Sequence, residues 1–288
     1  MFCINLCEIF HPYLSKKQNF ESFVNYVSSK QGKKVERIYL GSSFCSQYFL
    51  YIPDCKDVME YCLEKKISVT ITIPVFSEKD LNLGRRKLDE ICSIGNGVID
   101  EITVNDISTL FLIQTKNQYK INLGRLFFKD PRDCRVPEYF KTAVSPMLLS
   151  HLKDEFWRKF RFQLVELDTT NYIINTTNIV DTDIEIAVHK PYCYMSTGNI
   201  CKFASVHRDV KEKFRPNIPC KMECLHITDL HMGYVKPTNC KTAIRRIGRT
   251  LYYEMDSAEF IGKKPNREIF FPMNEWRRFR NENISSFK

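Results

Sequence analysis

The sequence predicts a single-domain α/β fold, a (β/α) barrel of the TIM-barrel type, from three observations. Apolar, β-branched runs of strand length alternate with segments of helical periodicity, which is the pattern of parallel βαβ units. The chain has 288 residues, and no Pro/Gly/Ser-rich linker divides it. Barrels of this size form one domain, and about seven strands in one undivided chain favour a barrel over an open sheet.

The expected strands end in turn-forming or polar residues. The run over residues 35–41 ends at Gly41, and the alternating run over residues 67–73 is ended by Pro74. Chemistry in such barrels lies at the C-terminal ends of the strands, so functional side chains are expected just after each run. The other predicted strands cover residues 101–104, 119–128, 161–167 and 184–188.

The intervening segments have helical spacing of their apolar residues. Asp54 is suited to cap a helix, Ser77 to open one, and a third helix follows Asn105 and Asp106. The expected helices cover residues 54–65, 78–92 and 106–115. We divide the chain into a barrel-like domain over residues 1–240, with a cysteine-rich insertion near 189–234, and a basic C-terminal extension over 241–288 that completes or flanks the barrel.

The composition excludes several protein classes. Twelve cysteines in 288 residues is about 4%, below the roughly 8–10% of short disulfide scaffolds. No apolar run approaches the length of a membrane span, and the N-terminus does not resemble a signal peptide, so we expect a cytoplasmic protein with reduced thiols. The formal net charge of +9 favours solubility first, with a basic face for an anionic substrate or RNA as the alternative.

Eight of the cysteines are expected to be packing or incidental thiols. Free cysteine is among the most buried residue types, and four of the eight lie within apolar periodic patterns. These four are Cys3, Cys7, Cys62 and Cys92. Three lie in loop-like stretches, namely Cys55, Cys134 and Cys240, and Cys193 competes with the set below for a metal site.

The remaining four cysteines lie where barrel chemistry is expected. Cys45 follows the turn after the strand over residues 35–41, while Cys201, Cys220 and Cys224 follow the last predicted strand. An irregular loop can bend several thiolates toward one point. The C-x₃-C spacing is not the usual C-x₂-C of zinc or ferredoxin sites, so a metal site and scattered thiols both stay open. The histidines that could serve zinc are His207, His226 and His231.

Several segments resemble the collagenase-like peptidase family (unassigned peptidase family thirty-two), most closely its UbiV-like iron–sulfur members. The sequence IYLGSSFC over residues 38–45 resembles that branch's strand-turn-cysteine segment. Residues 184–201, IEIAVHK continuing to YMSTGNIC, resemble the family signature, and Cys220 and Cys224 resemble its closing cysteine pair. The resemblance covers roughly residues 35–234.

The resemblance implies a barrel-like fold and a cofactor. In UbiV-like members four cysteines hold an oxygen-sensitive [4Fe–4S] cluster, and the matching residues here are Cys45, Cys201, Cys220 and Cys224. Better understood relatives are oxygen-independent hydroxylases of a quinone precursor or of RNA, although the family is labelled as peptidases. This chain departs from the pattern at Lys190, where the family has glycine, and the resemblance fades after Gly233.

We therefore expect an iron–sulfur protein that takes part in oxygen-independent hydroxylation of a small molecule, either as the hydroxylase or as its cluster-bearing subunit beside a homologous partner. The alternatives are an RNA-modifying member, a zinc-stabilised binding protein without catalysis, and a true peptidase. The sequence has no G-x-S-x-G and no H-E-x-x-H to support a peptidase, and no catalytic residue is assigned.

Candidate anion-binding residues for a dicarboxylate oxygen donor are Arg125, Arg132 and Lys190, because a guanidinium or ammonium group binds carboxylates. Each is also readily explained as a surface cation. The basic, aromatic stretch around Trp276 has two interpretations: an RNA-binding segment, or an amphipathic helix whose aromatic side chains pack on the barrel.

Overall fold

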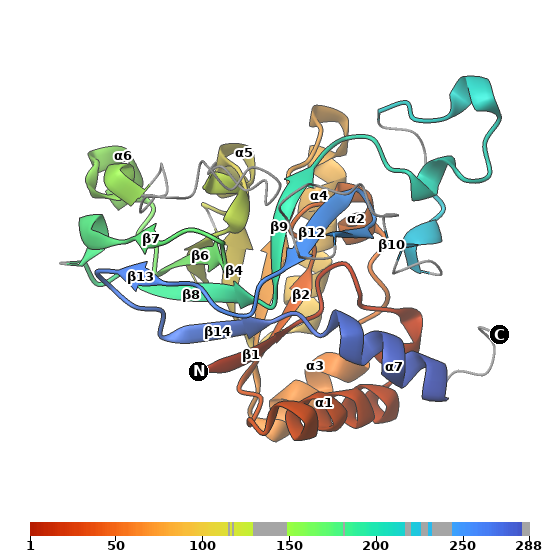
Figure 1. Ribbon diagram of the computed structural model, residues 1–288, viewed down its shortest axis with the longest axis horizontal. Coiled ribbons are helices and arrows are strands. Elements are labelled where there is room, and N and C mark those ends of the chain that lie inside the picture. The colour runs from red at the N-terminus through yellow and green to blue at the C-terminus, as the bar shows by residue number, and fades with distance from the viewer. Residues whose placement is uncertain are drawn as a thin grey trace.

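The computed structural model describes residues 1–114, 116, 118–128, 149–180, 182–216, 220–225, 230–231 and 244–283. Eight strands, each parallel to its neighbours, form a closed barrel (Figure 1). The predicted (β/α) barrel is therefore confirmed. In order around the barrel the strands are β1 (Phe2–Asn5), β2 (Arg37–Gly41), β3 (Ser68–Ile73), β4 (Ile99–Val104), β5 (Lys120–Leu123), β6 (Leu164–Asp168), β8 (Glu185–Lys190) and β14 (Arg267–Phe270).

The barrel closes between the first and the last of these strands. Phe2 of β1 is in register with Glu268 of β14, and Arg267 of β14 with Ala187 of β8. Strand β14 belongs to the region that the sequence suggested as a C-terminal extension, so that region supplies one wall of the barrel. Both β1 and β14 are four residues long, too short for a periodic pattern to reveal them.

Helices follow the first four strands on the outside of the barrel. Helix α5 (Ile107–Ile113) begins as predicted, because the Asp106 side chain accepts a hydrogen bond from the Thr109 N–H. The helix expected from Asp54 begins at Lys56 instead, and Asp54 bonds the N–H of that residue. The helices are α1 (Lys17–Gln31), α2 (Ser46–Leu50), α3 (Lys56–Lys65), α4 (Glu78–Ile94), α5, α6 (Glu155–Lys159) and α7 (Met273–Asn283).

Helix α7 packs against α1 on one side of the barrel (Figure 1). Trp276 and Phe279 are buried, and their rings lie 5.6 and 5.2 Å from the ring of Phe23. The structure therefore supports the amphipathic-helix interpretation, because the aromatic faces that an RNA would need are covered by the protein. No helix in the described part of the chain is long and apolar enough to cross a membrane.

A second, smaller sheet extends from the C-terminal end of the barrel. Strand β8 passes through Pro191 into β9 (Tyr192–Thr197), which pairs with β12 (Thr250–Glu254) in an antiparallel four-stranded sheet. Its other strands are β11 (Ile244–Ile247) and β10 (Leu230–His231), and a separate parallel pair is formed by β7 (Ile174–Asn175) and β13 (Phe260–Ile261). This sheet brings distant parts of the sequence to the mouth of the barrel.

Short 3-10 turns fill the connections. The strand predicted over residues 119–128 ends at Leu123, because Gly124 leads into the turn Arg125–Phe127. The other turns are Pro12–Ser15, Leu149–Lys153, Thr177–Ile179, Phe203–Ser205, Val210–Glu212 and Glu223–Leu225. The last three lie in the irregular segment after β9, part of which extends away from the barrel (Figure 1, teal).

The interior near the N-terminal ends of the strands contains a paired network of charges. Glu101 accepts hydrogen bonds from Arg267 at 2.6 and 3.0 Å, from Thr70 at 3.0 Å and from Asn122 at 2.9 Å. Arg37 lies 3.4 Å from the same carboxylate. Burial opposes ionisation of Glu101, but the two arginines outweigh it and lower its pKa to about 2.

Candidate metal centre

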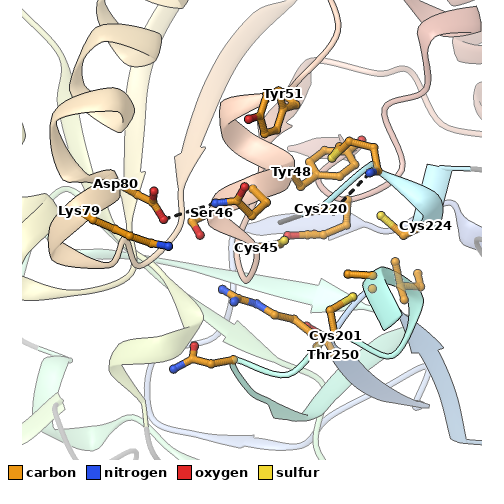
Figure 2. A pocket seen from close by; sticks show the side chains of 18 residues that line it. Cys45, Ser46, Tyr48, Tyr51, Lys79, Asp80, Cys201, Cys220, Cys224 and Thr250 are labelled. Atoms are coloured by element: carbon orange, nitrogen blue, oxygen red, sulfur yellow. Dashed lines mark hydrogen bonds between the residues drawn. The ribbon is translucent and has the colours of Figure 1, made fainter. Parts of the chain in front are cut away.

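A cavity of about 250 Å³ lies at the mouth of the barrel, and all four cysteines singled out in the sequence line it (Figure 2). Cys45 directly precedes α2, while Cys201, Cys220 and Cys224 come from the irregular segment after β9. The turn between β11 and β12 closes another side through Gly248 and Arg249. The cavity therefore joins parts of the chain that are more than 150 residues apart, at the barrel end where chemistry is expected.

The four thiols lie close enough to influence each other's ionisation. Every pair among them interacts electrostatically. Burial raises the pKa of Cys45, raises that of Cys220 to about 12 and raises that of Cys224 further, and the neighbouring cysteines add to each increase. Four thiolates at this place therefore need a compensating positive charge, and a metal centre that bound them would release protons.

The turn that carries Cys45 is held by backbone geometry that its sequence explains. Gly41 has a φ of +107°, and a Cβ there would lie 2.2 Å from the carbonyl oxygen of Thr72. Only glycine fits so close to the neighbouring strand. The Ser42 hydroxyl then accepts a hydrogen bond from the Cys45 N–H at 2.8 Å, which fixes the start of α2.

The segment that carries the other three thiols is held by side-chain contacts. Ser205 donates to the carbonyl of Cys201 at 3.1 Å, and the Met222 N–H points to the sulfur of Cys220 at 3.2 Å. His207 pairs with Glu223 at 2.7 Å and is not part of the cavity wall. The side chains of His226 and His231 lie outside the described residues.

The number and type of these donors are compatible with a [4Fe–4S] cluster. In the described parts of the chain, no three or more His, Cys, Asp or Glu side chains are grouped closely enough to hold one ion. In a [4Fe–4S] cluster each thiolate binds a different iron atom, so the four sulfurs surround the cluster without meeting at one point. Four cysteines around one cavity supply the number of thiolates that such a cluster needs, and the carboxyl groups of Glu8 and Asp80 line the same wall.

The other described cysteines lie away from the cavity. As predicted, Cys3, Cys7, Cys62 and Cys92 are buried in the core. Cys55 is also buried, at the start of α3, although the sequence suggested a loop. Cys193 packs on Tyr253 and does not line the cavity, and Cys134 and Cys240 lie outside the described residues.

The candidate anion-binding residues are not brought together with the cysteines. Arg125 is 1% exposed, lies 3.0 Å from the Asp168 carboxylate and stacks 4.7 Å above the Phe44 ring. Its charge is therefore balanced by a carboxylate of the chain itself. Lys190 lies 3.0 Å from Glu268 and lines a different cavity, and Arg132 lies outside the described residues.

Four charged residues of the cavity wall were missed in the sequence: Glu8, Lys79, Asp80 and Arg249. Arg249 donates to the carbonyl of Phe44 at 2.7 Å and so links the second sheet to the turn before α2. Glu8 follows β1, whose short length concealed the strand and therefore the position just after it. A search for polar residues after every short apolar run, including the first, would have found it.

No protein-family model matches the chain, and no curated protein matches it. Among solved structures, the chain is similar to a type I 3-dehydroquinate dehydratase from Clostridium difficile, with 12% sequence identity and a TM-score of 0.38. The match covers 65% of this chain and 73% of that chain.

Proposed function

We propose that Cys45, Cys201, Cys220 and Cys224 hold a [4Fe–4S] cluster and that the protein takes part in oxygen-independent hydroxylation of a small molecule. The observation that carries the proposal is that these four cysteines line one cavity at the mouth of the barrel. The hydroxylation rests on the resemblance of the surrounding segments to UbiV-like proteins. The same resemblance supports a role either as the hydroxylase or as its cluster-bearing subunit beside a homologous partner.

The cluster, when bound, would supply the redox chemistry, because soft thiolate ligands suit iron–sulfur centres. The residues of the chain shape the cavity and line the pocket for the substrate. The hydrogen bond from the Cys45 N–H to Ser42 and that from Arg249 to the carbonyl of Phe44 fix one side of the cavity. The apolar wall at Met222 and Ile247 and the polar groups of Glu8 and Arg249 together form a pocket for a small organic substrate.

Metal analysis after oxygen-free purification tests the proposal. We expect a brown protein with about four iron and four sulfide per chain, and loss of the colour in air. Stoichiometric zinc in a colourless protein would instead support the zinc-stabilised alternative and overturn the cluster. The measurement reports on the cofactor directly and does not require the substrate to be known.

A hydroxylation assay follows once the cluster is established. Small aromatic and quinone-precursor substrates would be incubated with the iron-loaded protein and a dicarboxylate oxygen donor in the absence of O₂, alone and with a homologous partner subunit. Product with one added oxygen atom supports the proposal. RNA that gains the oxygen instead, under the same conditions, would favour the RNA-modifying alternative.

A further inference from the structure

Glu8 has an unusual backbone conformation at the wall of the cysteine cavity. It is 5% exposed, and its φ of +66° is in the left-handed region, which residues other than glycine rarely adopt. Such strained residues persist only where the surroundings enforce them, and they are found disproportionately at functional sites. The backbone conformation of Glu8 is therefore a reason to consider the contacts of its carboxyl group.

One oxygen of this carboxyl group is fully occupied. Oε1 accepts hydrogen bonds from the Ser42 hydroxyl at 2.7 Å, from the Ser43 N–H at 2.6 Å and from the Phe44 N–H at 3.1 Å. Three donors from one turn fix the position and the plane of the carboxyl group. Because the same turn leads into Cys45, Glu8 is held in a constant place relative to the cysteines.

The other oxygen, Oε2, is buried and has no hydrogen-bond partner among the described residues. Buried polar atoms in folded proteins almost always have a partner, either in the protein or in a bound molecule. Since Glu8 lines the cavity, a molecule in the cavity can supply that partner. A carboxyl oxygen that is fixed by its neighbour and otherwise unpaired is prearranged to bind one group of a ligand.

The surroundings indicate which group it binds. Arg125 acts electrostatically on Glu8, and Lys79 and Arg249 line the same cavity together with Asp80, so Glu8 does not require a cationic ligand to balance its charge. Burial also raises the pKa of Glu8 and favours its neutral form. A neutral hydroxyl group matches both states of the carboxyl, because it can donate to a carboxylate and accept from a carboxylic acid.

We propose that Glu8 Oε2 is a binding subsite for a hydroxyl group of the small organic ligand in the cysteine cavity. The subsite deepens the proposed function, on which it rests for the role of that cavity as the reaction site. The ligand class is a hydroxylated organic molecule small enough for about 250 Å³, and an aromatic ring fits the apolar part of the wall at Tyr48, Met222 and Ile247.

The test compares two probes of similar size on the purified protein, phenol and fluorobenzene. Dissociation constants are measured by saturation-transfer NMR titration. We expect phenol to bind about tenfold more tightly, as one buried hydrogen bond allows. Equal affinities would show that Oε2 binds an ordered water only and would overturn the proposal without the use of any variant.

Two variants test whether the preference for phenol over fluorobenzene depends on Glu8. Glu8→Met keeps nearly the same side-chain length and removes both carboxyl oxygens, so it should reduce the preference for phenol to about twofold. Asp80→Asn is the control on the same wall, since Asp80 already accepts hydrogen bonds from Ser77 at 2.8 Å and Gln47 at 3.3 Å. A preference that survives in Glu8→Met, or that is lost equally in Asp80→Asn, would overturn the assignment.

Thermal unfolding of each variant and its iron content complete the test. Loss of the phenol preference with normal iron content isolates the subsite. Absence of iron in the wild-type protein, with the phenol preference intact, would contradict the proposed cluster while leaving the subsite supported. The two proposals therefore fail in different measurements.

Discussion

A buried glutamate lies near each end of the barrel, and the two differ in their hydrogen bonds and in the direction in which their pKa is shifted. Near the N-terminal ends of the strands, Glu101 has both oxygens bonded between Arg37 and Arg267, and its pKa is lowered to about 2. At the mouth, Glu8 has one oxygen without a partner among the described residues, and burial raises its pKa. The paired carboxylate of Glu101 stabilises the fold. The unpaired oxygen of Glu8 can still form a hydrogen bond, and it lies at the end of the barrel where enzymes of this fold have their active sites.

The same contrast extends to the cysteines. Cys62 lies in the core among apolar side chains, and Cys45 lies at the mouth among three other thiols. A thiol in the core contributes packing, whereas the thiol at the mouth is a ligand in the proposed cluster. Substitutions at matched positions can therefore separate the two roles.

The largest expected effect is on the cofactor. Cys45→Ala should remove one of four ligands and abolish stable iron binding, measured as iron and sulfide per chain after oxygen-free purification. Cys62→Ala should retain the iron and lower only the free energy of unfolding, by about 1 kcal/mol for a small core deletion. Equal iron content in the two variants would contradict the assignment of Cys45.

The next largest effect is expected in the charge network around Glu101, near the N-terminal ends of the strands. Glu101→Ala leaves Arg37 and Arg267 buried beside each other without their shared carboxylate, so the free energy of unfolding should fall by about 3–5 kcal/mol in denaturant titrations. Glu185→Ala is the control, because that carboxylate is half exposed and lies 3.6 Å from Arg267. Glu185→Ala should lower the free energy of unfolding by less than about 1 kcal/mol. A decrease as large as that of Glu101→Ala would contradict the greater importance of the buried carboxylate.

Acid should act on the two glutamates with opposite sign. The folded-state pKa of Glu101 is about 2, below the unfolded value near 4.3, so its contribution is present above pH 4.3 and is lost as the pH falls through 2. That contribution is about 3 kcal/mol, and Glu101→Gln should lack it when unfolding is measured from pH 6 to pH 2. The raised pKa of Glu8 predicts the reverse, since its ionisation at higher pH destabilises the fold.

The smallest expected effect is at Lys190. Its ion pair with Glu268 is partly exposed to solvent and lies away from the cysteine cavity. Lys190→Ala should therefore change the free energy of unfolding by no more than about 0.5 kcal/mol and leave the iron content unchanged. A loss of iron in this variant would show that the outer face of the barrel and the mouth are coupled.

The sequence predicted the barrel because the alternation over β2, β3 and β4 is long enough to show its period. It did not predict β1, β14 or the second sheet. Strands β1 and β14 have only four residues each, and the pairing in the second sheet is decided by distant partners. The ends of the predicted strand after Tyr119 were also wrong, because Gly124 turns the chain sooner than its apolar residues suggest.

The candidate site was predictable in part. Cys45 could be placed after a strand, and the chain positions of the other three cysteines suggested a shared loop. Arg125 has a charge that suggested anion binding, but only the fold shows that Asp168 balances it. Glu8 could have been found as the polar residue after the first short apolar run, whereas Arg249 reaches the cavity through a turn whose strands pair with distant partners.

The pairing of β1 with β14 has a consequence for how the protein is made. Cys45 leaves the ribosome more than 200 residues before Arg267, the first residue of β14. At 5–20 residues per second this interval is on the order of ten seconds or more. During that time β1 lacks one of its two neighbouring strands, and the wall around the thiols is incomplete. A metal centre at the four cysteines, as proposed above, would therefore be loaded only after these late strands have been made.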